Sequence, residues 1–440
     1  MSKKKQSIST SLPFLFTIGT LIFLVSFMVS SFPIARNPIK TDGIQRVYFA
    51  DNIGRGHREI IRKFNEVHKG EIEVNAIDLP FSKFNTNQRK ELIARNLRSR
   101  SSRIDVFSVD LIWVPRFTKW SEPLSPYFSS QFMRNLLPQA IETCYVDGLL
   151  YSIPLYIDIG ALLYREDLIL ELPNGENINS RIKRSITWEE LLQLGDDYFP
   201  GQPIYMAQAE AYEGLICNFN EVYGKSLKNS NTGMMIDLSD SLVIDRVTFL
   251  RDLIQSGKAP REVLEMNEDE CIDFALKNDV PFIRGWPTTN NRTDVIYDAE
   301  KFKKLAIAPL PHFKGEQSSP VFGGWNMMLS KHSPVKDAAI KFMQFAASYE
   351  GQRIFYEAEG LLPVQKRFFS STGEDNRSQR LAFIGSMMDH GIHRPAFVEY
   401  TLISDILSER IHQILAGELS PEIGMKMAWV EVQAIQFKGK

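Results

Sequence analysis

Tyr156 and Asp158 place a phenol and a carboxylate two residues apart in an otherwise apolar stretch of the 440-residue chain. Residues two apart on an extended segment point to the same face. The strand-like segments 149–153 and 159–164 flank the pair, so it lies where one strand hands over to the next. Polar side chains at such a junction suit a cleft better than a core, and we expect both to contact a ligand. The alternative is that they form hydrogen bonds only within the junction.

Further acidic and aromatic residues stand at the ends of other predicted elements. Asp110 follows the strand-like segment 104–109, and Trp286 directly precedes Pro287. Each has a purely structural alternative, because Asp110 could cap the next turn and Trp286 could fill a core. These residues belong to a set of short segments that occur in the order 104–113, 147–168, 212–219, 282–287, 308–313, 323–326 and 394–395.

In the same order, the segments resemble motifs of the bacterial extracellular solute-binding proteins of family 1, which serve sugar ABC importers. The set is most similar to the trehalose/maltose-binding branch. The resemblance covers the chain from about Val47 to the C-terminus. Each motif is short, so the number of motifs and their order carry the resemblance.

The resemblance implies an α/β periplasmic-binding-protein fold of type II, in which two lobes are joined by a hinge. Lobe one would comprise 44–157 plus 309–365, and lobe two 158–308 plus 366–440. The chain would cross between the lobes near 155–160, near 307–311 and near Pro363. Alternating strand-like and helix-like segments independently predict α/β lobes, with mostly parallel sheets.

The resemblance also implies a set of ligand-binding residues. They are Asp110, Tyr156, Asp158, Glu213, Gly214, Trp286, Gly323, Gly324, Trp325 and Arg394. Such a set suits a sugar, because aromatic rings stack on its C–H faces while carboxylates and Arg satisfy its hydroxyl groups. Glu213 could instead be a helix-surface carboxylate, and the two glycines an ordinary turn. Asn52 is a further candidate, at a strand–helix junction where the chain departs from the family pattern.

Composition and motifs limit the other classes of function. The formal net charge of −2 gives no basic field for nucleic acid. The sequence contains neither a G-x-S-x-G nor a G-x-x-x-x-G-K-[ST] motif. Cys144, Cys217 and Cys271 lack metal-ligand spacing, and their disulfide state is left open. We expect no metal, no cofactor and no enzymatic activity, although the many acidic residues leave a glycosidase pair open.

The first 43 residues form a separate region. Three lysines at 3–5 precede an almost uncharged run at 12–35, which is long enough to span a bilayer. The lysines should stay cytoplasmic, which places the large body outside. We expect an uncleaved transmembrane helix, and a signal peptide cleaved near 29–31 is the alternative. No cysteine follows the run, so the chain departs from the lipoproteins common in the resembling family.

These observations predict an extracytoplasmic protein, periplasmic or at the cell surface, that binds a disaccharide or oligosaccharide. It would deliver this ligand to the permease subunits of an ABC importer and be held at the membrane through 12–35. One alternative is a tethered sugar sensor that transports nothing, and another is a glycosidase with a similar cleft. The sequence does not name the sugar or its linkage.

Overall fold

The structure, a computed structural model, describes residues 43–80, 83–84, 86–100, 103–227, 235–288, 298–370 and 375–438. The predicted membrane segment at 12–35 lies outside these residues. Within the described part of the chain, no helix is both long and apolar enough to cross a membrane. The description below concerns the unit formed by Gln45–Lys440.

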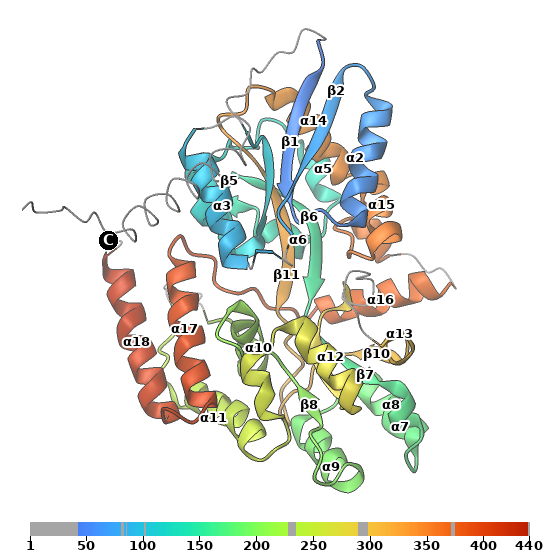
Figure 1. Cartoon of the computed structure of the whole chain (residues 1–440), viewed down its shortest axis with the longest axis vertical. Helices are drawn as coiled ribbons and strands as arrows, with labels where there is room; N and C mark the ends of the chain where they lie inside the picture. The colour runs from blue at the N-terminus through green and yellow to red at the C-terminus, as the bar shows by residue number, and fades with distance from the viewer. Residues whose placement is uncertain are drawn as a thin grey trace, which may run out of the picture. The chain divides into compact units, whose positions relative to one another are not determined.

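Lobe one is built on a five-stranded sheet, in the upper half of Figure 1. Its strands, in the order β2-β1-β3-β11-β6, are β2 (Ile72–Asp78), β1 (Gln45–Asp51), β3 (Val106–Asp110), β11 (Phe322–Leu329) and β6 (Ser152–Ile159). β1 runs parallel to β2 and β3, whereas β11 runs antiparallel to β3 and β6. A short hairpin of β4 (Tyr145–Val146) and β5 (Leu149–Leu150) directly precedes β6 in the sequence.

Lobe two is built on a four-stranded sheet, in the lower half of Figure 1. Its order is β10 (Leu305–Ala308), β7 (Ala161–Arg165), β9 (Phe282–Gly285) and β8 (Tyr205–Met206). β7 is antiparallel to β10 and β9, and only β8 and β9 pair in parallel. The prediction of mostly parallel sheets is therefore wrong. Parallel neighbours need a crossover connection, which is usually a helix. β7 instead comes directly from β6 of lobe one, and β11 comes from β10 of lobe two, so both run antiparallel to their neighbours.

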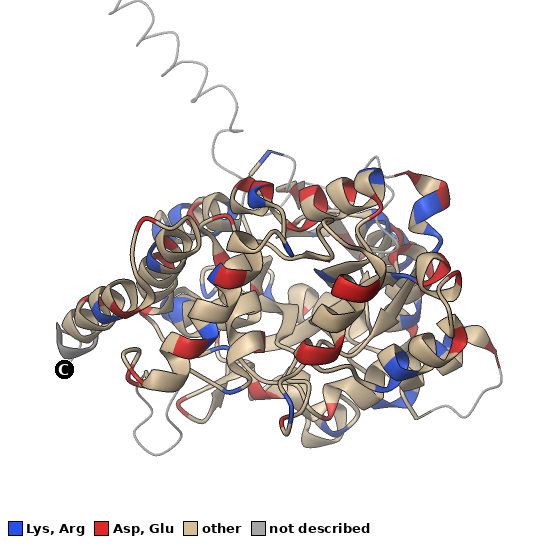
Figure 2. Cartoon of the chain, turned by 90° about the horizontal axis from the view of Figure 1, so that it is seen from below, with Lys and Arg blue, Asp and Glu red and all other residues tan. Residues whose placement is uncertain are grey.

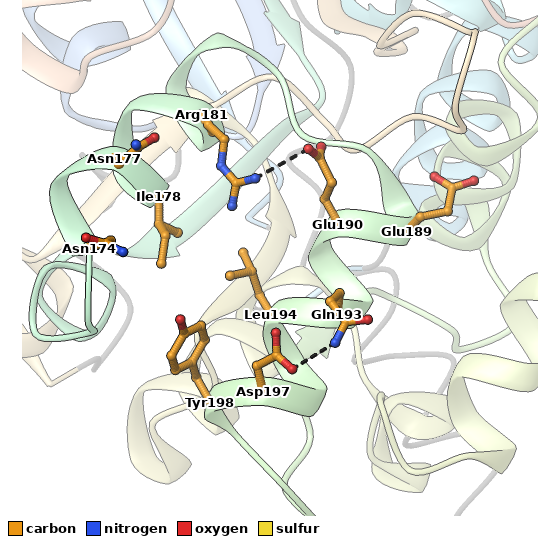
Figure 3. A pocket seen from close by; sticks show the side chains of 10 residues that line it. All are labelled: Asn174, Asn177, Ile178, Arg181, Glu189, Glu190, Gln193, Leu194, Asp197 and Tyr198. Atoms are coloured by element: carbon orange, nitrogen blue, oxygen red, sulfur yellow. Dashed lines mark hydrogen bonds and ion pairs between the residues drawn. The ribbon is translucent and has the colours of Figure 1, made fainter.

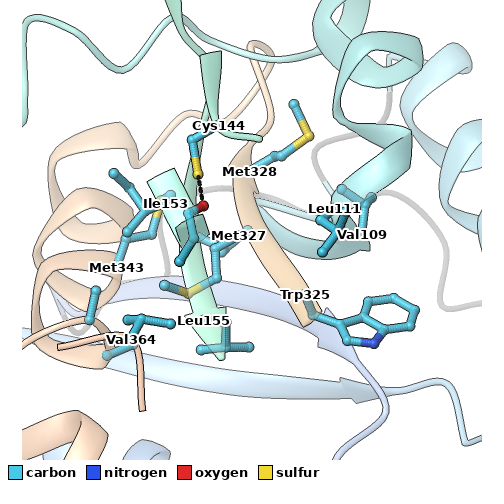
Figure 4. Close-up of a cluster of buried hydrophobic side chains, with 14 of the residues drawn as sticks. Val109, Leu111, Cys144, Ile153, Leu155, Trp325, Met327, Met328, Met343 and Val364 are labelled. Carbon is cyan, nitrogen blue, oxygen red and sulfur yellow. Dashed lines mark hydrogen bonds between the residues drawn. The ribbon is translucent and has the colours of Figure 1, made fainter. Parts of the chain in front are cut away.

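Helices cover each sheet and bury separate hydrophobic clusters. Lobe one carries α2 (Arg55–Val67), α3 (Thr86–Arg98), α4 (Val114–Phe117), α5 (Ser130–Arg134), α6 (Pro138–Glu142), α14 (Lys336–Ala346), α15 (Tyr349–Glu359) and α16 (Asn376–Met388). In its core the ring of Phe342 lies 5.3 Å from that of Phe49 and 5.4 Å from that of Phe64. Figure 4 shows another part of this cluster, which includes Cys144, Met327 and Met343.

Lobe two carries α7 (Glu166–Leu170), α8 (Gly175–Arg184), α9 (Trp188–Tyr198), α10 (Glu213–Tyr223), α11 (Ser241–Gln255), α12 (Glu268–Asn278), α13 (Ala299–Phe302), α17 (Tyr400–Leu415) and α18 (Pro421–Lys438). Thr187 and Glu190 form a capping box at the start of α9. The final helix, α18, packs along α17. Cys144, Cys217 and Cys271 are buried and free.

The chain passes between the lobes at Gly160, where β6 is followed by β7, and again between β10 and β11. The third passage differs from the prediction. α16 buries Leu381 and Ile384 in the cluster of lobe one, whereas α17 buries Ile403 and Leu407 in that of lobe two. The passage therefore falls between α16 and α17 rather than near Pro363, and 366–388 does not belong with lobe two. The apolar face of α16, which packs in the cluster of lobe one, decides where this third passage lies. The other predicted lobe boundaries stay a prediction.

Candidate functional site

Three neighbouring strands of lobe one bring most of the predicted residues together. Trp325 on β11 stands opposite Asp110 at the end of β3 and opposite Tyr156 on β6. Gly323 on β11 stands opposite Asp158. These pairs join segments more than a hundred residues apart in the sequence. The paired residues therefore lie together at the edge of the sheet from which the chain continues into lobe two.

Arg394 connects this edge to lobe two. Its Nη1 donates to Oε1 of Glu213 at 2.7 Å, and its Nη2 donates to Oδ1 of Asp110 at 3.1 Å. Only 4% of Arg394 is exposed. Glu213 is the first residue of α10, where a negative charge also suits the helix dipole. The predicted residues Asp110, Glu213 and Arg394 therefore form one ionic triad across the two lobes.

Two hydroxyl groups complete the surroundings of Glu213. Tyr400 donates to Oε1 at 2.7 Å, and Ser404 donates to Oε2 at 2.5 Å. Burial raises the pKa of Asp110 above its usual value, and the Arg394 charge offsets only part of that rise.

Lys90 is a further charged group of lobe one. Its ammonium lies 5.4 Å from the ring centroid of Trp113, and burial lowers its pKa.

Asp158 is the second acidic group of the edge and also reaches lobe two. Its Oδ2 accepts a short hydrogen bond from the hydroxyl of Thr288, and its Oδ1 accepts from the backbone of Ile159 at 3.0 Å. Burial raises the pKa of Asp158 to about 7, although these hydrogen bonds oppose the rise. Arg380 of α16 makes another link to this region by donating to the carbonyl of Pro287 at 2.8 Å.

Two tryptophans lie near the junction on opposite lobes. Trp325 is only 9% exposed and belongs to the hydrophobic cluster of lobe one. It lies edge-on to Trp113, with ring centroids 6.1 Å apart, and the guanidinium of Arg89 lies 4.4 Å from its ring. Trp286 is half-buried in lobe two, and the guanidinium of Arg284 lies 4.1 Å from its ring centroid. Its Nε1 lies 3.5 Å from Oε1 of Glu268.

The predicted glycines serve close contacts inside the protein itself. A Cβ on Gly323 would lie 2.9 Å from Cζ3 of Trp286. Gly324 has a φ of +136° and would bring a Cβ to 2.6 Å from the carbonyl of Tyr156, so only glycine suits this position. A Cβ on Gly214 would lie 2.2 Å from the hydroxyl of Tyr212. These glycines set the shape of the site by admitting neighbouring side chains and backbone.

A buried polar cluster at the first strand–helix junction was missed by the sequence analysis. Asp51 accepts from Nη2 of Arg89 at 2.8 Å and lies 3.2 Å from Nε2 of His57. Glu359 of α15 accepts from the backbone of Gly56 at 2.7 Å and lies 3.5 Å from Nδ1 of His57. Burial alone would lower the pKa of His57, but hydrogen bonds to the two carboxylates outweigh it and raise the pKa to about 9.

The one member of this junction that was predicted, Asn52, takes part through its backbone, which donates to Oδ1 of Asp51 at 2.7 Å. The positions of Asp51 and His57 were a usable signal. Asp51 ends β1 and His57 lies six positions later, in the first turn of α2, so the two side chains can meet at this junction. Glu359 gave no such signal, since it comes from a helix about three hundred residues later.

A separate depression of about 560 Å³ lies between α8 and α9 of lobe two (Figure 3). Its polar side chains largely bind one another, since Gln193 donates to Asp197 at 2.8 Å and Arg181 lies 3.5 Å from Glu190. It contains none of the predicted site residues. Over the residues that the structure describes, no group of three or more His, Cys, Asp or Glu is placed to hold a metal ion.

Residues 50–353, well over half of the chain, match the family described as Bacterial extracellular solute-binding protein. The chain belongs to this family. A protein of Deinococcus radiodurans named "Probable ABC transporter-binding protein" is 22% identical over 422 residues, which is 89% of this chain and 93% of that protein.

Solved structures agree on the fold. Maltose-bound MalE3 of T. maritima superposes with a TM-score of 0.76 at 22% identity, over 89% of this chain and 100% of that one. A solute-binding protein of Thermotoga lettingae bound with α-D-tagatose gives 0.75 at 20% identity, over 89% and 99%. The GacH receptor of Streptomyces glaucescens, solved without ligand and with acarbose, gives 0.73 at 19% identity, over 87% and 96%. The predicted two-lobe α/β architecture is confirmed.

Proposed function

We propose that this chain is the extracytoplasmic sugar-binding subunit of an ABC importer and takes a disaccharide or oligosaccharide. The observation that carries the proposal is the pairing of two tryptophan rings with an ionic triad at the junction of the lobes. Trp325 and Trp286 offer rings from opposite lobes, while Arg394 joins Asp110 to Glu213. Three known sugar or sugar-like ligands occupy proteins of the same fold, which agrees with this choice.

The ionised groups at the junction disfavour an anionic ligand. Asp110 and Glu213 share the single guanidinium of Arg394, so the triad keeps one excess negative charge. In the view of Figure 2, basic and acidic residues are interspersed over the side of the molecule that is shown. Carboxylates and guanidinium groups that already bind one another can accept and donate to sugar hydroxyls without a large change in charge.

In the proposed mechanism, a sugar contacts both lobes at once. Only the closed arrangement makes both sets of contacts, so binding shifts the population of the protein toward it. The closed protein then docks on permease subunits. The hydrophobic run at 12–35 would hold it at the membrane as an uncleaved helix, or would direct its export as a signal peptide.

Calorimetry with a panel of glucose, maltose, trehalose and maltotriose tests the proposal. We expect saturable binding of at least one disaccharide or longer sugar to the purified protein, and no release of monosaccharide on prolonged incubation. Absence of binding to every sugar would overturn the proposal, and hydrolysis would support the glycosidase alternative. Reconstitution with the importer's permease separates transport from sensing.

A further inference from the structure

The buried pair of Glu221 and Arg284 lies between the hinge and the aromatic surface of lobe two. Arg284 on β9 is fully buried and donates from Nε to Oε2 of Glu221 at 2.8 Å and from Nη2 to Oε1 at 2.7 Å. This two-point geometry fixes the plane of the guanidinium. Gln208 supports the same group, with its Oε1 3.5 Å from Nη1.

On one side, the pair contacts the two segments on which the chain crosses between the lobes. Oε1 of Glu221 accepts from the backbone of Val321 at 3.2 Å, and Val321 in turn accepts from the backbone of Gly160 at 3.0 Å. A Cβ on Gly160 would lie 1.9 Å from that same Oε1. Gly160 and Val321 belong to two of the segments on which the chain crosses between lobes, so one carboxylate of α10 contacts both crossings.

On the other side, the pair supports Trp286. The guanidinium carbon of Arg284 lies 4.1 Å from the centroid of the indole ring, within the range of a cation–π contact. The same indole touches lobe one through Gly323. A continuous set of contacts therefore runs from the two crossings, through Glu221 and Arg284, to the ring that the proposed function assigns to ligand contact.

The geometry points to Glu221 and Arg284 as positioning residues that couple the hinge to the orientation of Trp286. A change in the crossing segments would move the carboxylate, the carboxylate would carry the guanidinium, and the guanidinium would shift the ring. The inference rests on the proposed function for the role of Trp286, but the coupling itself is a property of the protein without ligand.

The test follows the fluorescence of Trp286 in ligand-free protein. The contribution of Trp286 is obtained by comparing each variant with the same variant carrying Trp286→Phe, because the chain has 6 tryptophans. Gly160→Ala is the decisive variant, since its methyl group would displace Glu221 and would lie 3.2 Å from Nη2 of Arg284. We expect acrylamide quenching of the Trp286 component to rise roughly twofold in Gly160→Ala and in Arg284→Lys, because the ring loses its fixed guanidinium cover.

Two matched variants control for general destabilisation. Arg165→Lys alters another buried arginine of lobe two, which binds Asp167 at two points away from the hinge. Gly195→Ala adds a methyl group that would lie 2.5 Å from Ile204 in the core of the same lobe. Both should leave the Trp286 component unchanged.

An unchanged Trp286 component in folded Gly160→Ala protein overturns the inference, and so does an equal change in either control. If Arg284→Lys or Gly160→Ala fails to fold, Glu221→Gln decides by the same criterion, since it keeps the shape of the side chain and removes its charge. Maltose titration of the same variants is a separate arm. A protein that binds no sugar defeats the proposed function while leaving the fluorescence result to decide the coupling.

Discussion

Single side chains at the lobe junction have separable contributions to binding and to stability. Trp286 is half-buried and packs against Arg284 and Gly323, whereas Trp188 is 2% exposed, with Tyr205 and Phe249 each 5.0 Å from its ring. A ring at a cleft and a ring in a core should respond differently to the same truncation.

We therefore expect Trp286→Ala to weaken sugar binding by about 1–3 kcal/mol, the order found when a stacking ring is lost. Its thermal stability should change little. The matched variant Trp188→Ala should lose about 3–5 kcal/mol of unfolding free energy, the usual effect of emptying a core site. Calorimetry and urea unfolding measure the two quantities. A large loss of stability in Trp286→Ala with affinity intact would show that Trp286 is a core residue.

The junction histidine gives a prediction for pH. The pKa of His57 is raised to about 9 in the folded protein, against about 6.5 for a free histidine. The protonated form is thus favoured by folding, so His57 stabilises the protein fully below about pH 6.5 and this stabilisation is lost as the pH rises through about 9. The difference in unfolding free energy between the protein and His57→Gln should shrink by up to about 3 kcal/mol across that range. A difference that stays constant with pH would mean that His57 is not charged in the folded protein.

At the scale of elements, α10 carries two carboxylates that bind arginines near the lobe junction. Its first residue, Glu213, binds Arg394, and Glu221 near its end binds Arg284. Local sequence does not predict which arginines these carboxylates meet, because that depends on packing between segments far apart in the chain.

Arg394→Met should lower the unfolding free energy by at most about 3–5 kcal/mol, since it leaves the partly buried carboxylates of Asp110 and Glu213 without their shared cation. Adding Asp110→Asn and Glu213→Gln to this variant should recover most of the loss, because the repulsion is removed. The glutamine amide can accept from one of the hydroxyl groups of Tyr400 and Ser404 and donate to the other. Urea unfolding without ligand measures both steps. A triple variant no more stable than Arg394→Met would show that the triad does not act as one electrostatic unit.

At the scale of the molecule, family motifs predicted more than periodicity did. The order of the motifs led to the two-lobe fold, and the predicted edge residues of β3, β6 and β11 lie side by side. Strand direction was missed, because local pattern is the same in parallel and antiparallel neighbours. The third crossing was misplaced because α16 is an amphipathic helix that either lobe could bury, and only its contacts with the first cluster decide. The contact of His57 with Glu359 could not be predicted for the same reason, because it joins segments about three hundred residues apart.

The last prediction concerns motion of the two lobes. Each has its own hydrophobic cluster, and contacts such as Arg394 with Glu213 and Thr288 with Asp158 join them at the junction. A sugar that bridges Trp325 and Trp286 adds contacts that exist only when the lobes approach, so it should favour the closed population. Small-angle scattering of protein starting at Gly43 should show a smaller radius of gyration at saturating sugar. The Trp286→Ala variant at the same sugar concentration should compact less, because fewer molecules are occupied. An identical profile with and without sugar, at saturation confirmed by calorimetry, would mean that ligand binds without closing the hinge.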